Sequence, residues 1–330
     1  MKLNKNAAYV LLHLLNGNTT AAKISQQMPD VNIRSVQRAL IQLSGQGIVI
    51  RKGPNNNPIY SVNYKKLLMA DIADRLLEDE KRPASRFNWE VATWLAKAPK
   101  QQLEPLFTDY TAGLEQLISP EKISAKELEY LTVELSWKSS ALEGNTYTLL
   151  DTQLLLLEGV RPKNKTEFET QMILNHKDAI AFIVQNRELF SGTIAFKAVE
   201  ELHRIIGCNL GIGAGLRKKL VRIGASNYVP LANPHQLREA GELVLGVINR
   251  VANPFIKALL ALALIPYLQL FDDGNKRTGR MLANAILIHS VGRGFSLRKT
   301  EVKPLTLAYL SFYEFNSVRS LGKILHNELT

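Results

Sequence analysis

One long apolar segment of the chain is interrupted by a short polar loop. Residues 253–288 read NPFIKALLALALIPYLQLFDDGNKRTGRMLANAILI. The part before the loop has the composition of a buried helix, which Pro266 should kink or end. Helical spacing of apolar residues resumes through Met281, Leu282 and Ala285. The pattern therefore predicts two helices joined by a tight turn.

The loop itself, QLFDDGNKRTGR from Gln269 to Arg280, has the residues of an anion site. A new helix begins after its Gly-Asn turn, where free backbone N–H groups and the helix dipole attract an incoming phosphate. Arg277 and Arg280 are three residues apart, so both lie on one helix face and can address the same polyphosphate. Asp273 can hold a Mg²⁺ ion that bridges phosphate oxygens. The loop is therefore a candidate phosphate site.

Outside this loop the sequence also indicates a mainly α-helical protein. Helical periodicity dominates from Phe87 onward. Only Lys218–Pro230, KKLVRIGASNYVP, alternates as a strand does around a Gly-containing tip, and there we expect a short hairpin or flap. Residues 64–86 are charged and are expected to form a helical connector. The predicted fold class is mainly α with small β-hairpins attached.

The first 62 residues follow a pattern of three helices and a hairpin. The predicted elements are helices at Asn6–Leu15, Thr20–Gln27 and Ile33–Leu43 and strands at Ile48–Arg51 and Ile59–Val62. This order resembles a winged helix-turn-helix, in which the third helix enters the major groove of DNA. The resemblance implies base or backbone contacts for Arg34, Gln37 and Arg38, and phosphate contacts for Arg51 and Lys52.

The charge of this segment agrees with DNA as a partner. The chain has a formal net charge of +11, and residues 1–62 contain seven Lys and Arg residues against the single acid Asp30. A basic excess confined to one module is the electrostatic footprint of nucleic-acid binding. The alternative is that the module docks against the rest of the chain or against a protein partner.

The polar loop resembles the Fic family motif HPFx[DE]GN[GK]RxxR, with Gln269 in place of the histidine and Leu270 in place of the proline. The resemblance implies a helical Fic core that binds ATP and Mg²⁺ and transfers AMP to a hydroxyl group of a target protein. By position, Phe271 would anchor the loop and Asp273 would bind Mg²⁺. The implied anion hole consists of Gly274, Asn275 and Lys276, and the implied phosphate ligands are Arg277 and, at the γ position, Arg280.

Two further stretches resemble motifs of the same family. Lys138–Thr148, KSSALEGNTYT, is similar to the inhibitory motif [ST]xxxE[GN], whose places are taken by Ser139, Glu143 and Gly144. The resemblance implies that Glu143 pairs with Arg280 and blocks the γ-phosphate position. Gly215–Leu231 is similar to the Fic flap, which aligns a target segment by strand pairing. The central residues of this flap are Val221, Arg222, Ile223 and Gly224.

Gln269 leaves three interpretations of the function open. The family histidine takes the proton of the target hydroxyl, and an amide does not accept a proton near neutral pH. In the first interpretation, the chain is a nucleotide-binding protein with weak or no transferase activity, and the bound nucleotide modulates the DNA-binding module. The second interpretation is an active adenylyltransferase restrained by Glu143, with Asp272 or Glu143 as the base, or a phosphotransferase indicated by Lys276. The third is a de-AMPylase in which Glu143 orients a water molecule.

No other histidine supplies an evident replacement base or a metal site. His203 is expected to be a packed or capping residue, and His235 follows the flap and can approach the site. His176 and His289 lie in helical stretches, and no spacing among the six histidines resembles a metal-ligand set.

These patterns predict three domains and a cellular location. They are a winged helix-turn-helix at 1–63, a helical connector with N-terminal helices at 64–125, and the inhibitory helix with the Fic core at 126–330. No segment is apolar for long enough to span a bilayer. The single cysteine, Cys208, is expected to be buried and agrees with a reducing compartment, so we expect a cytoplasmic protein. The target protein is unknown, and the resemblance implies a possible homodimer.

Overall fold

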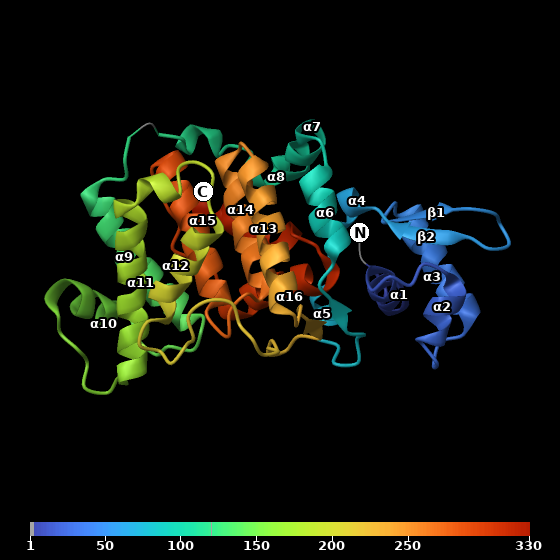
Figure 1. The fold of residues 1–330 in the computed structure, drawn as a ribbon, viewed down its shortest axis with the longest axis horizontal. Coiled ribbons are helices and arrows are strands. Elements are labelled where there is room, and N and C mark those ends of the chain that lie inside the picture. Colours follow the sequence, from blue (N-terminus) through green and yellow to red (C-terminus); the bar gives the residue numbers. More distant parts are fainter. Residues whose placement is uncertain (1–2, 120) are drawn as a thin grey trace. The chain divides into compact units, whose positions relative to one another are not determined.

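In a computed structural model, which describes residues 3–119 and 121–330, the chain is mainly α-helical, as predicted (Figure 1). Its internal contacts divide it into two units. The first unit holds the residues up to Lys97 together with Val221–Leu231 and Lys303–Leu321. The second unit holds Ala98–Leu220, Ala232–Val302 and Gly322–Thr330. Each unit therefore gathers segments that are far apart in the sequence.

Three helices and a hairpin open the first unit. They are α1 (Lys5–Leu15), α2 (Ala21–Gln26), α3 (Ile33–Gly45), β1 (Val49–Lys52) and β2 (Ile59–Val62), and the two strands pair antiparallel. Each helix starts where a polar side chain accepts a hydrogen bond from the backbone N–H three residues on: Asn4, Thr20 and Asn32. All five elements lie within two residues of their predicted bounds. Their assignment as a winged helix-turn-helix stays a prediction.

The expected helical connector at residues 64–86 is wrong. The structure has only α4 (Tyr64–Leu67), α5 (Asp74–Leu77) and the short strand β3 (Ser85–Arg86) there, followed by α6 (Trp89–Lys97). The carbonyl of Leu68 accepts the backbone N–H of Val318, and the carbonyl of Ala70 accepts the hydroxyl of Ser317 at 2.6 Å. Tertiary hydrogen bonds thus take the carbonyls that a continuous helix would use internally.

The expected hairpin at Lys218–Pro230 is also absent from the described residues. The chain turns at Gly224–Ala225, and its only strand, β4 (Tyr228–Val229), pairs parallel with β3 of the first unit. The backbone N–H of Ser85 donates to the carbonyl of Asn227 at 3.1 Å. The alternating pattern therefore identified extended backbone but not its strand partner.

A buried ion pair anchors this extended segment. Arg82 and Glu314, on α16 (Val302–Phe315), are joined by two hydrogen bonds of 2.5 and 2.9 Å, and their side chains are only 4% and 0% exposed. Glu314 also accepts the hydroxyl of Ser226 at 2.8 Å, and Arg82 also donates to the carbonyl of Ala225 at 2.7 Å. Because both charges are fully partnered, the pair ties residues 225–227 to α16.

The second unit is a helical bundle. Its longer helices are α9 (Ala125–Ala141), α11 (Glu167–Gln185), α12 (Phe196–Gly207), α13 (Pro234–Arg250), α14 (Pro254–Leu268) and α15 (Asn275–Val291), and α17 (Arg319–Leu329) ends in it. Shorter helical pieces are α7 (Lys100–Leu103), α8 (Thr108–Thr111) and α10 (Leu149–Gln153), which a π-helical turn extends to Glu158.

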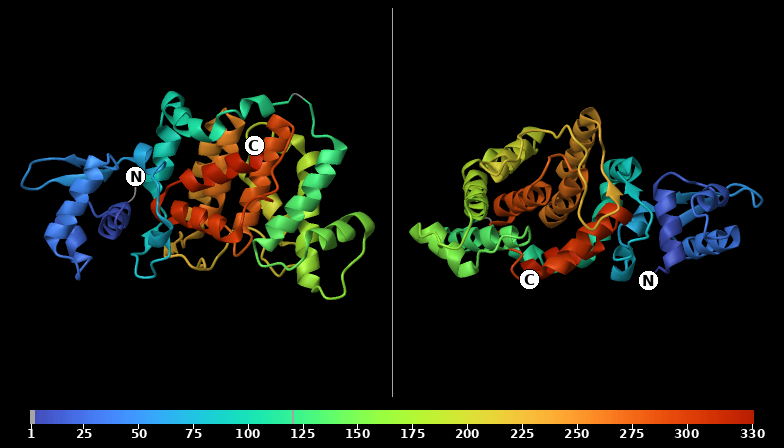
Figure 2. Two further views of the ribbon diagram at one scale, coloured as in Figure 1. Left: turned by 180° about the vertical axis from the view of Figure 1, so that it is seen from behind. Right: turned by 90° about the horizontal axis from the view of Figure 1, so that it is seen from below.

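The centre of this bundle is the pair α14 and α15, which lie side by side in every view of Figures 1 and 2. Every residue from Ala258 to Leu268 is buried. A Cβ atom on Gly279 would stand 2.8 Å from the ring of Pro266, so only glycine permits this close approach of the two helices. The core thus fixes both ends of the loop that joins them.

Two further expectations can be compared with the fold. Cys208 is exposed, so its expected burial is wrong: it follows directly on the end of α12, where its carbonyl accepts Asn175 Nδ2 at 2.7 Å. Across residues 3–119 and 121–330, no helix combines the length and the apolar character needed to cross a membrane.

Candidate functional site

The loop between α14 and α15 is closed by one asparagine. Asn275 Oδ1 accepts the backbone N–H of Phe271 at 3.0 Å, and Asn275 Nδ2 donates to the carbonyl of Phe271 at 2.8 Å. Gly274 has the left-handed φ of +79° that lets the chain turn directly into α15. The side chain of Asn275 is therefore occupied within the loop, and the first backbone N–H groups of α15 have no intrahelical acceptors.

Within the loop, the ring of Phe271 stacks on the ring of His203, which belongs to α12. The two ring centroids are 3.6 Å apart, and the planes differ by 7°. His203 Nε2 donates to the carbonyl of Asp273 at 3.0 Å, so this nitrogen carries the proton. Burial lowers the pKa of His203, which keeps the ring neutral. His203 is thus a packed residue, as expected, and it supports the turn that carries Asp273.

Gln269 is held at both its backbone and its side chain. It ends α14 in the left-handed region, with φ +48° and ψ +54°. Its carbonyl accepts the buried Arg217 Nε at 2.5 Å, and its Nε2 donates to the carbonyl of Pro266 at 2.7 Å. Its Oε1 faces Asn275 Nδ2 at 3.4 Å. The side-chain oxygen is therefore a hydrogen-bond acceptor, but it has no proton-accepting function near neutral pH.

The first turns of α15 carry three cations and, in the first turn, no acid. Arg277 Nη2 pairs with Asp273 Oδ2 at 2.9 Å, but Asp273 is 67% exposed, whereas the Arg277 side chain is 2% exposed. Arg277 Nη1 and Arg280 Nε are buried and have no hydrogen-bond partner among the described residues. Buried guanidinium N–H groups without acceptors are costly. Together with the helix N-terminus they form a site that an anion would complete.

A carboxylate in the turn that follows α9 already faces two of these cations. Glu143 Oε1 lies 2.7 Å from Arg280 Nη2, as the family resemblance implies, and Glu143 Oε2 lies 2.9 Å from Lys276 Nζ. Burial pushes the pKa of the Glu143 carboxyl upward, but the charges of Arg280 and then Lys276 outweigh it and hold the pKa below its ordinary value. Glu143 is therefore ionised at neutral pH and occupies the cationic end of the site.

A buried histidine on α11 holds the end of α9 that leads to Glu143. His176 Nδ1 lies 2.7 Å from the carbonyl of Met172, so it must donate, and Nε2 must accept the Ser139 hydroxyl at 2.8 Å. Burial lowers the pKa of His176 to about 3, which keeps this single neutral tautomer. The carbonyl of Ser139 accepts Arg280 Nη2 at 3.2 Å. Ser139 thus links α9 to both α11 and α15.

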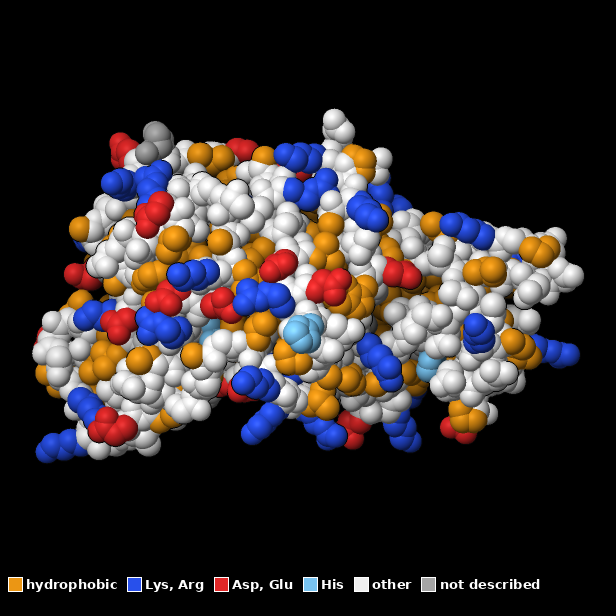
Figure 3. Space-filling model, viewed as in Figure 1, with side chains coloured by type: hydrophobic (Ala, Val, Ile, Leu, Met, Phe, Trp, Pro, Cys, Tyr) orange, Lys and Arg blue, Asp and Glu red, His pale blue; other side chains and the backbone are white. Residues whose placement is uncertain are grey.

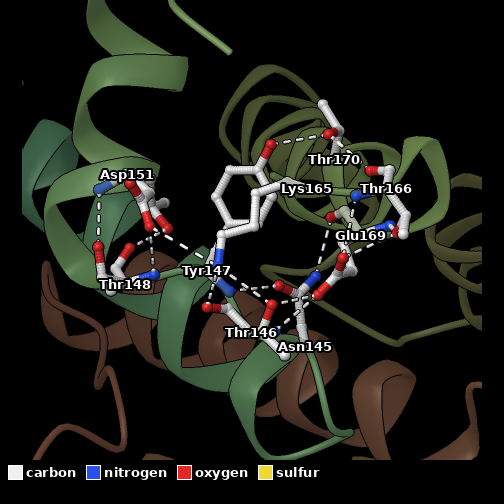
Figure 4. Close-up of polar contacts among 10 residues, drawn as sticks. Asn145, Thr146, Tyr147, Thr148, Asp151, Lys165, Thr166, Glu169 and Thr170 are labelled. Atoms are coloured by element: carbon white, nitrogen blue, oxygen red, sulfur yellow. Dashed lines mark hydrogen bonds and ion pairs between the residues drawn. The ribbon is translucent and has the colours of Figure 1, made fainter. Parts of the chain in front are cut away.

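The chain after Glu143 is fixed just as firmly. Gly144, with φ +91°, lets the chain leave the helix, and Asn145 Nδ2 donates to the carbonyl of Glu169 on α11 at 2.8 Å. Figure 4 shows the Glu169 carboxylate between the two threonines: Oε1 accepts the hydroxyl of Thr146 at 2.6 Å, and Oε2 accepts that of Thr166 at 2.8 Å. Hydrogen bonds, first that from Thr146, lower the pKa of Glu169 to about 2. The turn that presents Glu143 is therefore clamped on both sides.

The residues singled out for DNA contacts are exposed in the first unit. Arg34, Gln37 and Arg38 lie on the outer face of α3, and Arg51 and Lys52 lie on β1. Val36, Leu40 and Leu43 fill the inner face of α3, as predicted. At the right of Figure 3, where this module is drawn, Lys and Arg side chains outnumber acidic ones. The outward face of α3 thus carries basic and polar side chains beside the exposed apolar residues Ile33 and Ile41.

Two other groups of predicted residues are not among the described hydrogen-bond and ion-pair partners of the loop. Val221, Arg222, Ile223 and Gly224 belong to the first unit, where Arg222 and Gly224 are exposed. His235 is exposed at the start of α13, and its described hydrogen bond is that of its backbone N–H to Asn233 Oδ1. The sequence interpretation did not single out Arg217 or the pairing of Lys276 with Glu143. Their partners lie 52 or more residues away along the chain.

Asp273, the candidate Mg²⁺ ligand of the loop, suits this ion only when a nucleotide supplies further oxygen ligands. Asp273 is exposed, and its Oδ2 is shared with Arg277. In the described parts of the chain, no three His, Cys, Asp or Glu side chains gather into a metal cluster. Mg²⁺ commonly binds through one or two carboxylates and takes its other oxygens from water and phosphates. Asp273 is therefore a suitable protein ligand when phosphate oxygens are present.

Sequence comparisons identify the central segment of the chain. Residues 193–287 match the model of the Fic/DOC family, so the chain contains a Fic/DOC family domain that includes the whole loop. The protein adenylyltransferase Fic of Nematostella vectensis is 27% identical over 175 residues, 52% of this chain and 40% of that protein. The protein adenylyltransferase fic-1 of Caenorhabditis briggsae is 29% identical over 158 residues, 46% of this chain and 30% of that protein. The matches therefore span less than half of these relatives.

Solved structures with a similar fold agree with this assignment. A Fic domain containing signaling protein from Bacteroides thetaiotaomicron superposes with a TM-score of 0.53 at 18% identity, covering 68% of this chain and 92% of the other. Fic-1 from Caenorhabditis elegans gives a TM-score of 0.54 at 17% identity, covering 97% of this chain and 96% of the other. At this identity the likeness shows the fold, which is that of Fic proteins.

Proposed function

We propose that this chain, whose residues 193–287 form a Fic/DOC family domain, binds a nucleoside triphosphate at the start of α15 and transfers AMP weakly or not at all. The observation that carries the proposal is a pair of buried cationic donors: Arg277 Nη1 and Arg280 Nε are buried without described partners, beside a helix N-terminus with no acid in its first turn. A polyphosphate supplies the acceptors that these groups lack.

The same residues support an AMP transfer reaction in all but one step. In that reaction, a protein hydroxyl oxygen forms a bond to the α-phosphorus, the bond to the pyrophosphate oxygen breaks, and the hydroxyl proton passes to a base. Arg277 and Arg280 would bind and neutralise the phosphates, and Asp273 would hold Mg²⁺, which spreads negative charge when bound. Gln269 can orient the hydroxyl but cannot take its proton, which accounts for the proposed weak activity.

Glu143 is the brake in this proposal, because its carboxylate occupies Arg280 and Lys276. Replacing it by glycine, Glu143→Gly, should tighten binding of ATP with Mg²⁺ by about 10- to 100-fold, since a charged hydrogen-bonded competitor is removed. Isothermal titration calorimetry on the wild-type chain and the variant measures the change. Glu134→Gly, which removes an acid of α9 that pairs with Arg298, is the control and should not alter binding. Equal affinity of wild type and Glu143→Gly would contradict the proposed brake.

A second function, DNA binding by residues 1–63, is favoured by the exposed face of α3. Arg34 and Arg38 point outward from the same helix as Gln37, and the wing adds Arg51 and Lys52. A helix with two cations around an amide on one face combines phosphate contacts with a group suited to adenine. We therefore infer that this module binds duplex DNA.

Loss of either cation should weaken such binding. Arg38→Ala should lower affinity for a random-sequence DNA duplex several-fold and reduce the slope of log affinity against log salt by about 1, because one phosphate contact is lost. Fluorescence anisotropy at several salt concentrations measures both quantities. Lys65→Ala, an exposed cation on α4, is the matched control. If Arg34→Ala and Arg38→Ala both bind as the wild type does, a protein-docking role replaces the DNA role.

A further inference from the structure

We propose that Lys276 makes this site selective for a nucleoside triphosphate over a diphosphate once Glu143 is displaced. The proposal rests on the nucleotide binding proposed above. It adds which phosphate group of the nucleotide Lys276 binds. It assigns Lys276 two successive partners: the Glu143 carboxylate in the restrained site and the terminal phosphate in the released one.

The geometry of the Glu143 carboxylate is the first support. Its two oxygens are divided between two cations, with Oε1 at 2.7 Å from Arg280 Nη2 and Oε2 at 2.9 Å from Lys276 Nζ. A phosphate, like a carboxylate, presents several oxygens on one central atom. An anionic group that replaces the carboxylate at this point therefore meets Lys276 as well as Arg280.

The charge balance of the α15 N-terminus is the second support. Lys276, Arg277 and Arg280 add positive charge to the positive pole of the helix dipole, and no acid lies in the first turn. Among the described residues, the acids paired with these cations are Asp273, on Arg277, and Glu143, on the other two. When Glu143 leaves, Lys276 and Arg280 lose that described acidic partner together. An incoming anion must therefore carry enough negative charge to replace the Glu143 carboxylate at both cations.

The two cations differ in mobility, and this difference gives Lys276 its role. The Arg280 side chain is 1% exposed and is also bonded to the carbonyl of Ser139, whereas the Lys276 side chain is 40% exposed. Lys276 can therefore follow an anion that stands slightly farther out than the carboxylate. A diphosphate lacks the terminal group that takes the place of Glu143, so it gains little from this lysine.

The test compares ATP with ADP in the released protein. Each nucleotide, with Mg²⁺, is titrated calorimetrically into Glu143→Gly, into Glu143→Gly with Lys276→Met, and into Glu143→Gly with Lys197→Met. Methionine keeps an unbranched apolar stem and removes only the charge, and Lys197 is an exposed lysine on α12 that serves as the control. We expect Glu143→Gly to prefer ATP, Lys276→Met to reduce the ratio of ATP to ADP affinity by about 10-fold, and Lys197→Met to leave it unchanged. Lys276→Arg should retain most of the preference.

The outcomes separate this inference from the proposed function. A ratio of ATP to ADP affinity that Lys276→Met leaves within about twofold of the Glu143→Gly value would overturn the role of Lys276 while nucleotide binding stands. Failure of Glu143→Gly to bind either nucleotide would overturn the proposed function and this inference with it. Far-ultraviolet circular dichroism and melting temperature, compared with the parent protein, verify that each variant is folded.

Discussion

Replacing Gln269 by histidine in the Glu143→Gly protein should raise the rate of AMP transfer by about 10²- to 10⁴-fold. The backbone of residue 269 is already held in the left-handed conformation by Arg217, whose Nε donates to the carbonyl of Gln269 at 2.5 Å. The substitution therefore changes the side chain and not the path of the chain. An imidazole has a pKa near neutrality and accepts the hydroxyl proton, which the amide does not.

The reaction can be followed with ATP labelled on the α-phosphate, incubated with the protein and a cell lysate. Label on protein after Gln269→His, but not after Gln269→Asn, is the expected result, because asparagine keeps an amide and adds no base. ATP labelled on the γ-phosphate distinguishes phosphate transfer from AMP transfer. If the Gln269 protein labels its targets as fast as the histidine variant does, another group takes the proton. Asp272, exposed in the loop, is then the first candidate.

Breaking the buried Arg82–Glu314 pair should have the largest effect on stability. Glu314→Gln leaves the Arg82 charge buried with a neutral partner, and removal of one member of a buried pair costs about 3–5 kcal/mol. The loss is expected to be at the high end, because Glu314 also accepts the Ser226 hydroxyl and the backbone N–H of Asn227. Urea-induced unfolding followed by circular dichroism measures the free energy of unfolding.

Two comparison variants make this prediction specific. Glu78→Gln breaks an exposed pair with Lys303 and should produce no measurable change. The double replacement Arg82→Leu with Glu314→Leu removes both charges and should restore part of the stability that Glu314→Gln loses. A loss for Glu314→Gln no larger than that for Glu78→Gln would show that the pair does not anchor residues 225–227.

The helices and the loop were predictable because their signals are local. Apolar spacing before and after the loop marks α14 and α15, Asn253 caps the start of α14, and Gly274 marks the turn into α15. Pro266 was expected to kink or end its helix, and α14 does end two residues later, at Leu268. The left-handed conformation of Gly144 also explains why the inhibitory motif ends in Gly or Asn, the residues that adopt it most readily.

Local sequence patterns could not predict contacts between residues that are far apart in the sequence. Residues 64–86 look helical by charge and spacing, but carbonyls at 68 and 70 bond to residues almost 250 positions later. The extended character of Lys218–Pro230 was evident, yet its strand partner β3 is far away in the sequence, and the nearby Arg82–Glu314 pair joins residues 232 positions apart. The second partner of Glu143, Lys276, was likewise hidden, because the motif describes Lys276 as part of a loop and not as a cation for a remote acid.

The claim that the start of α15 is a phosphate site is tested most directly by one titration. ATP with Mg²⁺ is titrated into Glu143→Gly and into the same protein carrying Arg280→Ala. Arg280 is 1% exposed and, without Glu143, has no described acidic partner, so its loss should weaken ATP binding by at least about 10-fold. Binding of equal strength with and without Arg280 would contradict the phosphate site.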